Sequence, residues 1–147
     1  MNSARFVPAF VAGALTTIVL AIVFYTYRVL DEQVAIGALY TPAQEFQTYV
    51  KNLLGLTPTY GIALILGLLI AFRAAAFLKR ILVPLAPIAY PLAGAVAVFA
   101  VIWLIENTAA RGGAGAMGGA RSLFGVVLQM AAGFIGGTVF AILRPRS

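Results

Sequence analysis

Apolar residues dominate four long stretches of this chain, and most of the polar residues are confined to the segments between them. The stretches are Phe6–Tyr27, Tyr60–Leu78, Pro84–Ile105 and Leu123–Leu143. At about 1.5 Å per helical residue, each is long enough to cross a hydrocarbon core of about 30 Å. The pattern predicts an all-α membrane protein, with four transmembrane helices in a single transmembrane domain over residues 1–147.

The longest connection between these stretches contains a predicted amphipathic helix at residues 41–54. Thr41, Pro42 and Gln44 have the order of an N-cap, a first helical residue and a capping box, and Gly55 is the expected end. We expect the helix to lie in the plane of the outer membrane interface. The helix is then either a lid or docking surface, for which its apolar face is available, or only a tether for the connection. That face consists of Phe46, Tyr49, Val50, Leu53 and Leu54.

Three prolines open the third apolar stretch. Pro84 and Pro87 are expected before or within the first helical turn, where the missing backbone N–H has no partner to lose. Pro91 would then be the one proline that kinks the helix.

The distribution of charges predicts the orientation. With both termini on one side, six of the ten Lys and Arg residues fall on that side, and all four acidic residues fall on the other. Positively charged loops favour the cytoplasm, so we expect cytoplasmic termini in a bacterial inner membrane. Five tyrosines, Tyr60 among them, and Trp103 gather toward the outer interface, and Tyr90 lies toward the inner one. The first stretch lacks a small-x-small cleavage site after Tyr25 and is interpreted as a retained signal anchor.

Composition narrows the function classes. Charged residues make up 10% of the chain, against about 25% in a typical soluble domain. The net charge of +6 is carried mostly by residues that flank the apolar stretches, which indicates membrane lipids as partners and not nucleic acid. The chain contains no cysteine and no histidine, and no serine has a plausible activating base. We therefore expect no cofactor, no metal and no enzymatic activity.

Three basic residues are candidates for contact with a lipid or another anion. Arg73 is the only charged residue well inside an apolar stretch, and Lys79 and Arg80 follow at its end. The long side chain of Arg73 either reaches the headgroups or faces the helix bundle, where it would bind an anion or a partner carboxylate.

A polar site is also expected on the outer side. Glu106 ends the third stretch, and Arg111 and Arg121 border the connection that follows. These side chains either pair at the interface or leave Glu106 as an entrance site for a cation or a proton. The Gly- and Ala-rich connection itself is expected to be a flexible linker.

The fourth stretch contains a ridge of small residues next to one amide. Gly133 and Gly137 have G-x-x-x-G spacing, and Ala132 and Gly136 widen the same side. Gln129 lies about two turns into the stretch, where an amide usually bonds to a neighbouring helix. These residues are predicted to form a helix contact, either within the chain or with a partner.

These observations favour a non-catalytic accessory or scaffold subunit of a larger inner-membrane complex, in contact with other membrane-protein subunits or with copies of itself. The alternative is a small oligomeric transporter or channel for an ion or a small solute. A solute pathway needs several polar groups at mid-membrane depth. The candidates are few, namely Thr16, Thr17, Gln129 and Thr138, so the subunit hypothesis comes first.

Overall fold

The computed structural model describes residues 3–109 and 122–144, and every element in this part of the chain is helical. Among the described residues, four helical segments are long and apolar enough to cross a membrane. The all-helical class and the four membrane-length helices are therefore confirmed. The elements are α1 (Ser3–Ala35), α2 (Pro42–Leu56), a π-helical turn (Thr57–Gly61), α3 (Ile62–Ile81), a 3-10 turn (Val83–Leu85), α4 (Ala89–Ala109) and α5 (Leu123–Leu143).

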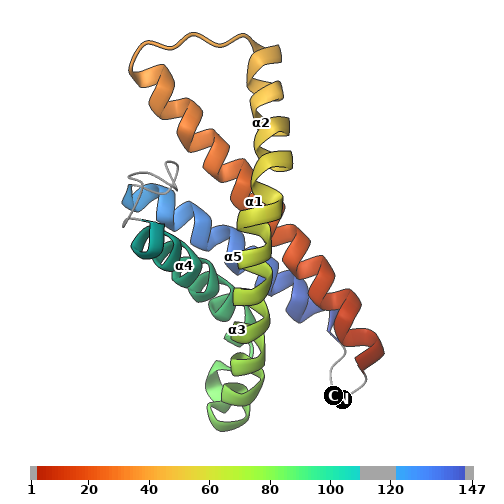
Figure 1. Ribbon diagram of the computed structural model, residues 1–147. Coiled ribbons are helices and arrows are strands. Elements are labelled where there is room, and N and C mark those ends of the chain that lie inside the picture. The colour runs from red at the N-terminus through yellow and green to blue at the C-terminus, as the bar shows by residue number, and fades with distance from the viewer. Residues whose placement is uncertain (1–2, 110–121, 145–147) are drawn as a thin grey trace.

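α5 is the central helix of the bundle. It packs against α1 on one side and α4 on the other, and α3 packs mainly against α4 (Figure 1). One apolar cluster around Ile22, Leu64 and Ile102 fills the half of the bundle near the start of α5. A second, aromatic cluster fills the other half, where the rings of Phe72 and Phe140 stack with centroids 4.5 Å apart.

α2 and α3 form one continuous helical segment, Pro42–Ile81, and run as a single rod in Figure 1. Thr41 and Gln44 form the predicted capping box, but Gly55 does not end the helix. The prediction was wrong because a π-helical turn carries the chain past Pro58. A proline ring clashes with the carbonyl four residues earlier in a regular α-helix, and a wider turn relieves that clash. α2 thus continues the course of α3 and is not shown lying flat in an interface.

The helices differ greatly in length. α1 has 33 residues and the α2–α3 rod has 40, which correspond to about 50 and 60 Å, whereas α4 and α5 have 21 residues each, or about 30 Å. Arg28 of α1 lies beside Ser122 at the start of α5. Residues 29–51 therefore extend beyond α5 as two helical arms, at the top of Figure 1. We call these residues the projecting hairpin.

Pro91 does not kink α4. The helix begins at Ala89, so Pro91 is its third residue and lies in the first turn. Backbone N–H groups of a first turn have no partner within the helix, and the proline therefore breaks no hydrogen bond there. The expected kink was wrong because the prediction started the helix at Pro84. That proline lies in the 3-10 turn before the helix.

Candidate functional site

The small residues of α5 contact neighbouring helices of the same chain. A methyl group added at Gly133 would overlap the carbonyl oxygen of Gly94 in α4. A methyl group at Gly137 would meet the carbonyl of Tyr90, also in α4, and one at Gly136 would meet Thr17 of α1. Ala132 is fully buried in the core. The ridge is thus occupied inside the chain and is not free to receive a partner.

Gln129 connects three helices through hydrogen bonds in the core. Its Oε1 accepts a hydrogen bond of 2.9 Å from the hydroxyl of Tyr60, in the π-helical turn, and its Nε2 donates one of 2.8 Å to the carbonyl of Ala21 in α1. Tyr60 is 2% exposed and faces the core, so it differs from the aromatic side chains expected at the outer interface. The π-helical turn carries its side chain into the bundle. Both polar side chains have partners, as buried polar groups require.

Arg28 organises the end of the bundle near the start of α5. Its guanidinium forms ion pairs with Asp31 and Glu32 at 3.0 and 3.1 Å, and donates a hydrogen bond of 3.2 Å to Ser122 Oγ. Ser122 also caps α5 by accepting a hydrogen bond from the N–H of Gly125. Since all four acidic residues lie at this end or in the hairpin, we call it the acidic end. Glu106 is exposed there, and its proposed partners Arg111 and Arg121 lie outside the described residues.

The predicted docking face of α2 is partly packed against the bundle and partly exposed. Tyr49 and Leu53 are half-buried, and Leu53 packs against the core cluster around Ile22. Phe46, Val50 and Leu54 are exposed on the other side of the helix. A hydrogen bond that the sequence had not indicated fixes α2 to α1, because Asn52 Nδ2 donates to Thr26 Oγ1 at 2.9 Å.

The opposite end of the bundle carries basic side chains, and we call it the basic end. Lys79 Nζ and Arg144 Cζ lie 5.3 and 5.2 Å from the centre of the Tyr90 ring, as in cation–π pairs. Burial and the neighbouring Arg80 both lower the pKa of the Arg144 guanidinium. Arg73 and Arg80 are exposed, so Arg73 does not face the interior of the bundle.

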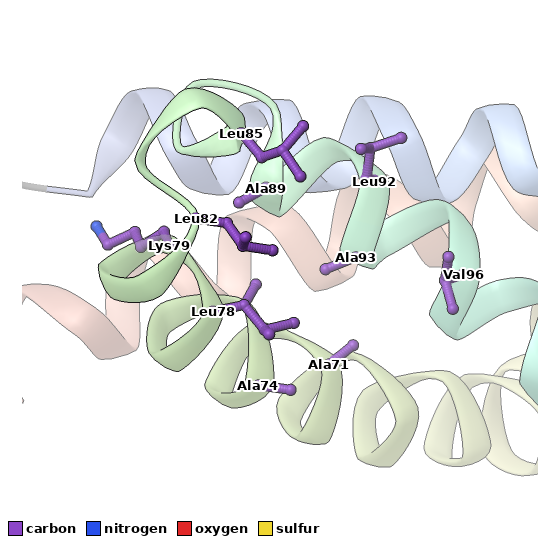
Figure 2. Close-up of a pocket in the computed structure, with 11 residues that line it drawn as sticks. Ala71, Ala74, Leu78, Lys79, Leu82, Leu85, Ala89, Leu92, Ala93 and Val96 are labelled. Atoms are coloured by element: carbon purple, nitrogen blue, oxygen red, sulfur yellow. The ribbon is translucent and has the colours of Figure 1, made fainter.

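A groove runs along the surface between α3 and α4. It contains two hollows of about 280 and 430 Å³ that share Ala71 and Val96 in their linings, and we call it the α3–α4 groove. Figure 2 shows the hollow nearer the basic end, with Ala71 and Leu78 on one wall and Ala93 on the other. Lys79 lies at its end, and its amine points away from the apolar lining (Figure 2).

The described part of the chain shows no cluster of metal ligands. Within residues 3–109 and 122–144, no three His, Cys, Asp or Glu side chains gather as metal ligands. The surfaces that stand out are instead the projecting hairpin, the basic end and the α3–α4 groove. Comparison with protein-family models, curated proteins and solved structures returns no match for this chain.

Two residues at these surfaces were missed by the sequence reasoning. Tyr90 lies under both cations of the basic end, and Asn52 fixes α2 to α1. Tyr90 was the one tyrosine placed toward the inner side, which was a signal that it differs from the others. Asn52 carried no such signal, since it is one of several polar residues on an amphipathic helix.

Proposed function

We propose that this protein is a non-catalytic accessory or scaffold subunit of a larger assembly in the bacterial inner membrane, with both termini in the cytoplasm. The projecting hairpin is its docking element. The observation that carries the proposal is the set of large apolar side chains that this hairpin exposes beyond the start of α5.

Three of these side chains are exposed more than most others in the chain. Leu39 is 94% exposed, Ile36 86% and Phe46 69%. Exposed apolar residues of α3, α4 and α5 contact lipid, so their exposure carries no free-energy penalty. The hairpin, by contrast, extends past the roughly 30 Å that the hydrocarbon core occupies. Apolar side chains gathered outside the hydrocarbon mark a surface that another protein covers. An inner-membrane partner with a domain on the acidic side fits this position.

The buried polar groups support a subunit over a small transporter or channel. Thr17 and Thr26 donate hydrogen bonds to carbonyls of their own helix, and Gln129 is bonded to Tyr60 and Ala21. Within residues 3–109 and 122–144, these buried polar groups are engaged in packing, which supports the subunit over a path for ions. The α3–α4 groove is lined almost entirely by apolar side chains.

Gentle extraction of the tagged protein from its native membrane, followed by mass spectrometry, tests the proposal. We expect one defined partner at fixed stoichiometry with the unaltered protein. The double substitution Leu39→Ala and Phe46→Ala removes exposed apolar area from the hairpin and should reduce partner recovery at least tenfold. The matched control, Gln47→Ala with Lys51→Ala, changes exposed polar residues of the same helix and should retain the partner.

Two outcomes would overturn this proposal. Equal recovery of the partner with both double variants would show that the hairpin is not the docking element. Recovery of the chain alone would contradict the accessory role, and flux measurements in liposomes would then test the transporter alternative.

A further inference from the structure

The hollow of the α3–α4 groove nearer the basic end is about as long as one membrane leaflet is thick. This hollow extends along α3 from Ala71 to Lys79, which is about 12 Å at the rise of an α-helix. Half of a typical hydrocarbon core is about 15 Å. An acyl chain of the leaflet at the basic end would therefore fit lengthwise in this hollow.

The end of the hollow carries positive charge. Lys79 lines it, and its amine lies 5.3 Å from the centre of the Tyr90 ring, which Arg144 Cζ approaches to 5.2 Å. All four acidic side chains of the sequence lie at the acidic end or in the hairpin, so none of them lies beside Lys79. The cation at the end of an apolar groove matches a phospholipid, whose acyl chain ends in an anionic headgroup.

A partner transmembrane helix would account for the apolar lining of the hollow but gives no reason for a cation at its end. A phospholipid accounts for both, because its acyl chain is apolar and its headgroup carries a phosphate.

We propose that the α3–α4 groove binds an anionic phospholipid from the leaflet at the basic end, with one acyl chain along Ala74 and Ala93 and the phosphate at Lys79. The site is independent of the projecting hairpin, which lies at the opposite end of the molecule. The proposal therefore does not depend on the docking role of that hairpin.

Lipid binding to the purified full chain tests the site. The protein is delipidated in mild detergent and reloaded with phosphatidylglycerol or phosphatidylcholine of the same acyl chains, and bound lipid is counted by native mass spectrometry. We expect about one phosphatidylglycerol per chain and at least fivefold weaker retention of phosphatidylcholine. Lys79→Gln should weaken phosphatidylglycerol retention about fivefold, as expected for one cation near a phosphate.

Two variants with matched controls separate the groove from general surface attraction. Ala74→Phe fills the groove from an exposed position and should abolish retention of both lipids, whereas Val19→Phe adds the same bulk to the lipid-facing side of α1 and should not. Arg73→Gln removes one exposed charge from α3 outside the groove and should leave retention within twofold.

Three results would overturn the proposal. Equal weakening by Lys79→Gln and Arg73→Gln would mean attraction to the basic surface as a whole. Unchanged retention in Ala74→Phe would mean that the groove is empty. A change from oligomer to monomer in Ala74→Phe, with lipid retention unaltered, would identify the groove as a contact between copies of this chain.

Discussion

Gln129 shows how one side chain can specify a packing arrangement inside a membrane. An amide offers both an acceptor and a donor, and here each is used toward a different helix. The sequence predicted a bond to a neighbouring helix but not which one. In hydrocarbon such a group has no water to bond with, so a wrong arrangement of the three helices leaves it unsatisfied.

A double-mutant cycle at this site should measure the coupling. Gln129→Leu should cost about 1–3 kcal/mol, because it leaves the Tyr60 hydroxyl buried without a partner. Tyr60→Phe should cost about 1 kcal/mol, and the double variant should cost less than the sum of the two by about 0.6 kcal/mol, as is typical of hydrogen bonds between transmembrane helices.

The measurement for this cycle is reversible unfolding in mixed micelles of increasing denaturing detergent. Thr138→Val is the control, since the Thr138 hydroxyl bonds the carbonyl of Phe134 in its own helix, and it should change the free energy of unfolding little. Strict additivity of the two single substitutions would contradict the bond between Gln129 and Tyr60.

At the scale of elements, the contacts of α5 depend on which face each glycine occupies. Gly133 and Gly137 meet α4, whereas Gly136 meets α1, so one small-residue ridge serves two neighbours. The spacing alone indicated close helix approach but not the partners. Small residues allow helix backbones to approach closely. In a membrane this contact matters because apolar side chains gain little free energy when they move from lipid into a helix interface.

Two glycine substitutions should change stability in opposite directions. Gly133→Ala places a methyl group against the carbonyl of Gly94 and should cost about 1–3 kcal/mol, since α4 must move. Gly55→Ala places a methyl group in open space within α2 and should stabilise the protein by about 0.5–1 kcal/mol through helix propensity. Detergent unfolding of the purified monomer measures both. A neutral Gly133→Ala would contradict the close contact between Gly133 and α4.

The whole molecule is asymmetric along its long axis. The acidic end carries the projecting hairpin, and the basic end carries exposed Arg73 and Arg80 without any acidic side chain of the sequence. Basic segments are retained on the cytoplasmic side, so this asymmetry supports the proposed orientation. In that orientation the projecting hairpin and the Lys79 end of the α3–α4 groove would lie on opposite sides of the membrane.

Single-cysteine labelling should test this orientation, and the chain offers a cysteine-free background. Gln47→Cys in the hairpin should react with a membrane-impermeant maleimide in intact cells, whereas Arg80→Cys should react only after permeabilisation. Ile70 is 71% exposed in the middle of α3. Ile70→Cys should react in neither case, because lipid surrounds this position. Labelling of Arg80→Cys in intact cells would reverse the topology.

Local properties of the chain could be predicted well. The capping box at Thr41 depends on residues close together in the sequence, and α5 covers the expected Leu123–Leu143. The length of α1 was not predicted, since this helix continues eight residues past the expected Tyr27. The errors at Gly55 and Pro91 concern where helices join or begin. A π-helical turn and a 3-10 turn decide these points, and both depend on packing as well as on propensity.

The sequence by itself determined that this is a helical chain with four membrane-length apolar segments and charges divided between two ends. These properties depend only on residues that are close together in the sequence. The length of an apolar segment and the charges that flank it do not depend on how the rest of the chain folds. Only the tertiary structure decided that α5 is central, that Tyr60 is buried against Gln129 and that a groove lies between α3 and α4 beside Lys79. Such features arise from close packing between residues that are far apart in the sequence. The hydrophobic pattern along one chain does not indicate which helix faces will pack together.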